Sequence, residues 1–141
     1  MSELKTAKEC AKAMWSSDAA SKALGMKVEI RKTGGSTARL TVRKDMINGF
    51  GVCHGGIVFA LADTAFAFAC NAYNRKAVAA SGSIEFMRPV KLGDELRATA
   101  TEEYRGRKSG FYSVKVENQD GQTVALFRGR SVSRSAPILK K

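Results

Sequence analysis

The sequence contains few of the residues that hold metals or disulfides. It has one histidine and three scattered cysteines, Cys10, Cys53 and Cys70, with no Cys-x-x-Cys pair. A structural zinc site takes about four nitrogen or sulfur ligands, and a disulfide framework takes an even set of cysteines. The sequence therefore predicts no metal, no redox cofactor and no disulfide network, and free thiols are typical of a reducing cytoplasm.

The sequence also lacks the long apolar segments that enter membranes. Its most apolar run, residues 57–70, contains Asp63 and is shorter than the roughly 20 residues that cross a bilayer. Residues 1–13 carry several charged side chains, among them Lys5, Lys8, Glu9 and Lys12, so they lack the uninterrupted apolar block of an export signal. We expect a cytoplasmic protein with no membrane partner.

Acidic residues are few, 13 against 24 Lys and Arg, which gives a formal net charge of +11. The basic residues are spread along the chain, without a recognition helix, zinc finger or aromatic and basic RNA-binding motif, so we predict no nucleic-acid partner. A ligand with several phosphates, such as coenzyme A, uses Arg and Lys contacts in the same way on a smaller scale. The first candidates for such contacts are Arg88, Arg128 and Arg130.

The 141 residues fit one domain, 1–141, of the α+β class. Apolar spacing predicts an N-terminal helix over 5–23 (region 1–25), a hairpin over 26–42, a Gly-rich loop over 44–56 and a central helix from Ile57, apolar on nearly every face. Period-two patterns then predict four strands, over 78–86, 95–104, 109–117 and 123–133, and the polar tail 135–141 is expected to be flexible. An antiparallel β-sheet wrapped around the central helix is the economical arrangement.

Asp63 is the residue most indicative of chemistry, because almost every neighbour in the run 57–68 is apolar. A carboxylate buried there without a partner costs several kcal/mol, so it must be paired, protonated or open to a cleft. One interpretation is a carboxylate that faces solvent or bonds to nearby backbone. The other is a general base or nucleophile whose pKa is tuned by its apolar surroundings.

His54, Gly55 and Gly56 immediately precede the expected central helix. Amides at a helix N-terminus have no partner within the helix, and the helix dipole favours negative charge there. Glycines let a ligand carbonyl approach closely, since they carry no Cβ. The amides of Gly55 and Gly56 are therefore candidate oxyanion-hole donors, although a flexible loop with a capping histidine would contain the same residues.

The spacing of these two features predicts a dimer. At 1.5 Å per residue, Asp63 lies about 12 Å along the helix from Gly55, too far for both to act on one carbonyl. If two central helices lie antiparallel across a two-fold axis, Asp63 of one chain faces Gly55 of the other. The active site then requires a homodimer with two equivalent sites.

Several motifs along the chain carry a family resemblance: Asn48-x-x-Gly51-x-x-His54-Gly55-Gly56, Leu61-Ala62-Asp63-Thr64-Ala65, Pro89 with Gly93-Asp94, and 123–129 near the end. With these, the sequence resembles the phenylacetate-degradation (PaaI-type) thioesterases of the hotdog superfamily over nearly its whole length. The resemblance implies hydrolysis of phenylacetyl-CoA-like, hydroxyphenylacetyl-CoA-like or medium acyl-CoA thioesters to free acid and CoA. It implies no cofactor, since coenzyme A is part of the substrate, and a homotetramer built as a dimer of dimers.

The resemblance also implies roles for individual residues. Gly55 N–H holds the thioester oxygen, and Asp63 activates water or attacks directly. His54 orients the loop or shapes the site, and Asn48 positions water or the thioester. Candidates to hold the hydrolytic water are Thr64, Ser81 and Ser83, and Phe59 is a candidate contact of the acyl group at the dimer seam. The family often has Asn where this chain has Ser17, which bears on acyl-group preference.

Three alternatives remain open from the sequence. A hotdog hydratase or dehydratase would use the histidine for proton transfer, and a non-catalytic acyl-CoA-binding protein would bind without turnover. Cys53 beside His54 could suggest a Cys-His nucleophile, but adjacent residues usually point apart.

Overall fold

The computed structural model describes residues 2–140 and is built from one sheet, one central helix, two N-terminal helices and a short 3-10 helix. The elements are, in order, α1 (Glu3–Ser16), α2 (Ala19–Ala23), β1 (Lys27–Glu29), β2 (Gly35–Thr41), the 3-10 helix η1 (Lys44–Met46), α3 (Gly55–Cys70), β3 (Ala77–Phe86), β4 (Glu95–Arg105), β5 (Ser109–Glu117) and β6 (Thr123–Ser133). The hairpin and the four later strands expected from the sequence are confirmed, and the bounds of β5 and β6 are those predicted.

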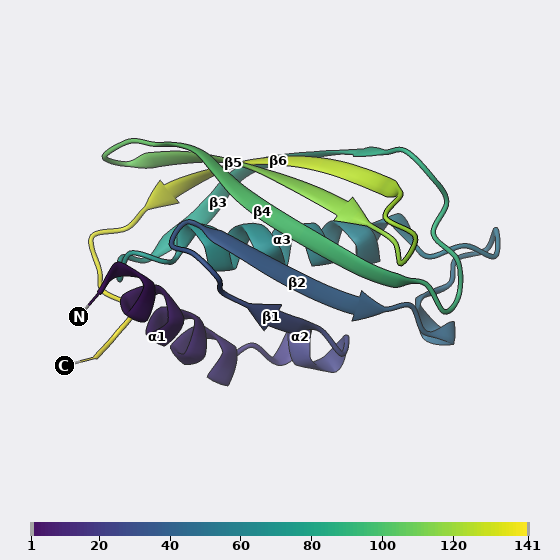
Figure 1. The fold of residues 1–141 in the computed structure, drawn as a ribbon, viewed down its shortest axis with the longest axis horizontal. Helices are drawn as coiled ribbons and strands as arrows, with labels where there is room; N and C mark the ends of the chain where they lie inside the picture. Colours follow the sequence, from purple (N-terminus) through teal and green to yellow (C-terminus); the bar gives the residue numbers. More distant parts are fainter. Residues whose placement is uncertain (1, 141) are drawn as a thin grey trace.

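All six strands form one antiparallel sheet in the order β1-β2-β4-β5-β6-β3. The sheet curls over α3, which runs beneath it, while α1 and α2 lie beside β1 (Figure 1). The predicted hotdog arrangement, a sheet wrapped around one long helix with an added N-terminal helix, is confirmed. The strand order places β1 and β3 at opposite edges of the sheet.

The single N-terminal helix predicted over 5–23 is wrong, because the chain forms two helices there. α1 ends at Ser16, and the Asp18 carboxylate accepts a hydrogen bond from Ser21 N at 3.0 Å, which caps the start of α2. Aspartate at a helix N-cap satisfies an amide that the helix itself cannot. The apolar spacing continues across this break, which is why it suggested one helix.

The inward face of the sheet packs on one side of α3. The Phe66 ring lies 5.6 Å from the Tyr112 ring and 5.7 Å from the Phe127 ring, measured between centroids, and all three side chains are buried. The other side of α3 is only half-buried, including Phe59 and Asp63. The expectation of a helix covered on all sides is therefore wrong for a single chain, because the sheet covers one side alone.

The edge strand β3 adds to this uncovered surface. Val78 and Phe86 on the strand are 45% and 55% exposed, and Met87 just beyond it is 51% exposed. One backbone edge of β3 pairs with β6, and no strand within residues 2–140 pairs with the other. Free strand edges with apolar side chains are surfaces on which a second chain can pair.

The C-terminal segment forms hydrogen bonds to the residues that follow α3. The amides of Ile138 and Leu139 both donate to Asn74 Oδ1, at 3.0 and 2.8 Å, and Lys76 N donates to Ala136 O at 2.8 Å. Part of the tail that was expected to be flexible is thus hydrogen-bonded to the segment that follows α3, and its flexibility stays a prediction. Lys141 lies outside the described residues.

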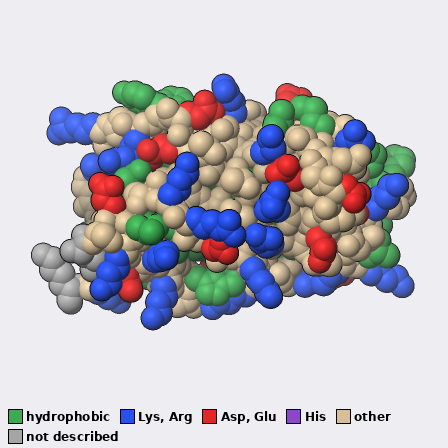
Figure 2. Space-filling model, in the orientation of Figure 1, with side chains coloured by type: hydrophobic (Ala, Val, Ile, Leu, Met, Phe, Trp, Pro, Cys, Tyr) green, Lys and Arg blue, Asp and Glu red, His purple; other side chains and the backbone are tan. Residues whose placement is uncertain are grey.

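The surface carries its positive charge in a dispersed form. Figure 2 shows Lys and Arg side chains over the whole visible face, with Asp and Glu side chains between them. None of the helices within residues 2–140 has the length and apolar character needed to cross a membrane.

Candidate active site

The central helix begins two residues earlier than predicted, at Gly55, and His54 is its N-cap. Gly56 N–H donates to His54 Nδ1 at 2.9 Å, and Ile57 N–H donates to His54 O at 2.9 Å. The Gly55 N–H has no acceptor among residues 2–140. Of the two predicted oxyanion donors, only the Gly55 amide is available in this structure, because the Gly56 amide is hydrogen-bonded to the His54 ring.

The turn before the helix is organised by Asn48. Its Oδ1 accepts hydrogen bonds from Phe50 N at 2.9 Å and Val52 N at 3.3 Å, and its backbone N–H donates to Val52 O at 2.8 Å. Gly51 has a φ of 80°, a conformation that side chains with a Cβ rarely adopt. The Asn48 carboxamide oxygen is thus used to build the turn, which leaves only its NH₂ group for the predicted contact with water or thioester.

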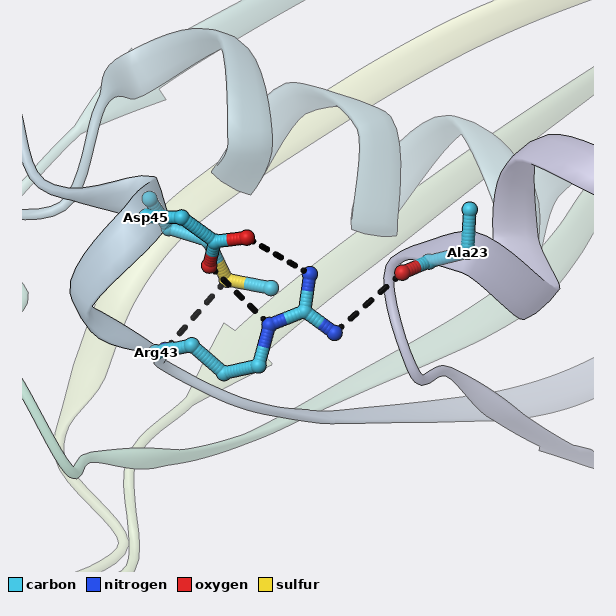
Figure 3. A network of polar contacts seen from close by, with 4 residues as sticks. Ala23, Arg43 and Asp45 are labelled. Carbon is cyan, nitrogen blue, oxygen red and sulfur yellow. Dashed lines mark hydrogen bonds and ion pairs between the residues drawn. The ribbon is translucent and has the colours of Figure 1, made fainter.

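The segment that leads into this turn is anchored to α2. The Arg43 guanidinium binds both oxygens of Asp45, at 3.0 and 3.3 Å, and donates to Ala23 O at 3.2 Å (Figure 3). Downstream, His54 N donates to Met46 O at 2.8 Å and Cys53 N donates to Val90 O at 2.7 Å. The loop before α3 is therefore held at both of its ends, by the Arg43 contacts at its start and by the backbone bonds of Cys53 and His54 at its end. These contacts fix the direction in which the Gly55 N–H points.

An aromatic ring lies directly over Gly55. A Cβ placed on Gly55 would be 3.1 Å from Cζ of Phe86, the last residue of β3. Phe86 was not among the predicted site residues, because its place beside Gly55 depends on the pairing of β3 with β6. The sequence predicts a strand over residues 78–86 but does not show what the Phe86 side chain meets.

Asp63 is half-buried on the uncovered side of α3, and its carboxylate has no hydrogen-bond or ion-pair partner among the described residues. Burial raises the pKa of Asp63 above the usual aspartate range, because the charged form loses water. Of the two interpretations open from the sequence, the carboxylate bonded to nearby backbone does not fit this geometry. A partly desolvated carboxylate without a partner is a suitable base or nucleophile.

Thr64, predicted to hold the hydrolytic water, points toward the N-terminal helices. Its hydroxyl donates to Ala60 O at 2.8 Å and lies 3.4 Å from the hydroxyl of Ser21 in α2. Its hydrogen-bonding capacity is therefore largely used within its own chain.

The structure does not bring Ser81, Ser83, Arg128 and Arg130 to Asp63. In the β3–β6 ladder Ser81 pairs with Arg130 and Ser83 with Arg128, and directly paired residues point to the same side of a sheet. The residues between them on β6 face α3 and are buried, so these four side chains lie on the outer face. Within one chain, the two serines therefore lie on the opposite face of the sheet from Asp63, away from the place where they were predicted to hold water. All four line a shallow outer pocket with Glu103, whose carboxylate lies 3.5 Å from Arg128 Nη2.

The remaining candidates divide between the site and its surroundings. Phe59 lies one turn before Asp63, and its ring packs edge-on against Phe127, with centroids 5.4 Å apart. Arg88 is exposed just beyond β3. Cys53 is buried, burial raises the pKa of its thiol, and its Sγ lies 3.6 Å from the backbone oxygen of His54, so this cysteine is not an activated nucleophile.

Comparison with known proteins identifies the family. The model of the thioesterase superfamily matches residues 50–125, which include the Asn48 turn from Phe50 onward, Gly55, Asp63 and Phe86. The chain belongs to the thioesterase superfamily. It is 46% identical over 121 residues to the acyl-coenzyme A thioesterase PaaI of Escherichia coli K12, and the match covers 86% of each chain.

Similar solved structures agree with this assignment. The Escherichia coli PaaI structure superposes with a TM-score of 0.94 at 43% identity, covering 96% of this chain and 99% of that one. A Streptococcus mutans protein solved with acetyl-CoA bound has a TM-score of 0.76 at 25% identity, covering 79% of this chain and 90% of that one. This thioesterase is therefore an enzyme of the PaaI type, and the hydratase and non-catalytic alternatives are set aside.

We predict that His54 acts as a helix cap. Replacing His54 by Ala removes the acceptor of Gly56 N–H and should lower the free energy of unfolding by about 1 kcal/mol. His54→Asn supplies another N-cap acceptor and should recover most of that stability in urea unfolding curves. It should also recover most of the thioesterase activity, whereas a His54→Asn enzyme that is stable but inactive would assign the imidazole a chemical role.

Proposed function

We propose that the chain hydrolyses acyl-CoA thioesters, with aromatic or medium-chain acyl groups preferred, to the free acid and coenzyme A. The observation that carries this proposal is a pair of unsatisfied groups on one helix. Gly55 presents an amide at the start of α3 and Asp63 presents a carboxylate two turns along it, and neither group has a partner within residues 2–140. These are a donor for a developing oxyanion and a group that can deliver or replace water.

The two groups act together only across a dimer. They lie about 12 Å apart along α3, which is more than one carbonyl and its attacking water can span. An antiparallel pairing of two α3 helices brings Asp63 next to Gly55 of the partner subunit and covers the half-buried side of each helix. The exposed edge of β3 and the side chain of Phe50, which is 95% exposed in the Asn48 turn, supply further apolar surface for such a contact. Two of these dimers would form the tetramer.

The reaction follows from this placement. Gly55 N–H polarises the thioester carbonyl and stabilises the negative charge that develops on its oxygen, aided by the dipole of α3. Asp63 either removes a proton from the attacking water or attacks the carbonyl carbon itself. In both routes the carbon–sulfur bond breaks and coenzyme A leaves as the thiol after protonation. In the covalent route the acyl group is left on Asp63 as an anhydride, and water then hydrolyses this anhydride to give the free acid and regenerate the carboxylate. Single-turnover hydrolysis in ¹⁸O-water separates the two routes, because label enters the Asp63 side chain only after covalent attack.

The apolar surroundings of the site suit an aromatic or aliphatic acyl group. The Phe86 ring lies over Gly55, and Phe59 lies on the Asp63 side of α3, so a carbonyl held by Gly55 N–H has apolar surface beside its acyl chain. Acetyl-CoA bound to the Streptococcus mutans relative supports a CoA-linked substrate. Exposed Arg88 remains a candidate for the CoA phosphates, and Arg128 and Arg130 could serve only from the outer face of the sheet.

We predict that Asp63→Asn lowers kcat for phenylacetyl-CoA by about 100-fold or more, measured as thiol release, because the side chain can no longer accept a proton or attack. The fold should be kept. A folded-state pKa above the unfolded value means that stability falls as pH rises through the window between them, so removing the charge costs no stability at pH 7. In the wild type, kcat/KM should fall on acidification at a pH above the usual aspartate pKa of about 4. Equal rates for the two proteins would remove Asp63 from the mechanism.

A second prediction tests the Gly55 amide alone. Gly55 is the first residue of α3, where proline fits a helix because its missing N–H would have no helical partner. Gly55→Pro should therefore leave the fold intact and lower kcat by about 100-fold. Gly55→Ala is the matched control, since it adds the same Cβ beside Phe86 but keeps the N–H. If both variants lose the same activity, crowding by Phe86 and not the amide explains the loss.

A further inference from the structure

A second candidate ligand site lies between α1 and β1, far from Gly55. It is a cleft of about 540 Å³, within the range typical of small-molecule sites. The cleft sits at the β1 edge of the sheet, opposite the β3 edge that carries Phe86. It reaches α3 only at Phe68, which is 13 residues and about 20 Å along the helix from Gly55.

The floor of the cleft is aromatic and aliphatic. The Trp15 and Phe68 rings lie 6.4 Å apart between centroids, and Phe68 and Ile30 are buried beneath the opening. Trp15 itself is only half-buried, so part of the indole faces the cleft. A flat apolar group entering the cleft would stack against existing aromatic surface.

The rim of the cleft is positively charged. Lys8 and Lys12 stand one turn apart on α1, and Lys27 faces them from β1. None of these three lysines forms an ion pair within residues 2–140. The one acid at the rim, Glu29, already pairs with Arg31.

We propose that this cleft binds a monocarboxylate with an aromatic or short aliphatic body. The apolar floor accepts the body, while the unpaired lysines at the opening accept the single negative charge at its end. Lysine contacts an anion as a point charge, and arginine, whose two-pronged geometry matches phosphate, is absent from the residues that line this cleft. Free acids of this class are the products of thioester hydrolysis, so the proposal rests in that respect on the proposed function.

The single tryptophan of the chain gives a direct measurement, since Trp15 lies in the cleft. The Asp63→Asn protein, which keeps the full chain, would be titrated with phenylacetate and with octanoate while Trp15 fluorescence is followed. We expect a saturable change with both acids and none with phenylethanol or phosphate. Failure of thioesterase activity would not affect this result, because no turnover is measured.

Two variants locate the binding. Lys8→Ser with Lys12→Ser removes charge from the rim and should weaken binding about fivefold or more. Lys44→Ser with Lys115→Ser is the matched control, because it removes two exposed lysines outside the cleft and should leave binding unchanged. Ala11→Leu fills the cleft with a residue that suits a helix and should abolish binding while kcat/KM for phenylacetyl-CoA stays within about twofold.

Three outcomes would overturn the proposal. One is the absence of a saturable change at millimolar acid, and another is binding that survives both Lys8/Lys12 replacement and Ala11→Leu. The third is a fluorescence change that follows protein concentration instead of acid concentration, because a second copy of the chain would then cover the cleft.

Discussion

The first backbone amides of a helix have no hydrogen-bond acceptor within that helix. At the start of α3, one of these amides, that of Gly55, has no acceptor anywhere in residues 2–140. His54 accepts the Gly56 N–H, while the anchored loop before it points the Gly55 N–H away from every acceptor in residues 2–140. An unsatisfied amide at the positive end of a 16-residue helix is a strong site for an oxyanion. The capping histidine, the Asn48 turn and the Arg43 anchor all serve to keep that amide in place.

The second constraint is the distance between this amide and Asp63. Neither group has a partner in the described part of the chain, and both lie on one rigid helix, so neither can approach the other within a chain. The side of α3 that carries Asp63 is also the side that the sheet leaves half-covered. The proposed dimer would account together for the incomplete burial, for the carboxylate that has no partner within residues 2–140 and for the edge of β3 that no described strand pairs with.

Much of the fold could be predicted because local patterns dominate it. Strands β4 and β5 alternate between buried and exposed residues, and β6 does so over most of its length. Asp63 stands out as a carboxylate within an apolar helix, and Gly55 as a glycine at the start of that helix. The sequence does not predict the features that depend on contacts between residues far apart in the chain. The register of β3 against β6 directs the two serines of β3 outward, and the same pairing brings Phe86 to Gly55. The tail is hydrogen-bonded to Asn74. Local periodicity in the sequence indicates none of these contacts. Asp18 is a residue type typical of a helix N-cap and so indicates the break between α1 and α2. The apolar spacing continues across this break and predicts one helix instead.

The most direct test of shared active sites mixes two defective chains. Asp63→Asn and Gly55→Pro proteins, each nearly inactive, would be unfolded together, refolded and assayed for phenylacetyl-CoA hydrolysis. If Asp63 acts with Gly55 of the partner subunit, every mixed dimer keeps one intact site, and an equal mixture should recover about one quarter of the wild-type activity. No recovery above the separate proteins, with mixed dimers shown to be present, would contradict a site built from two chains.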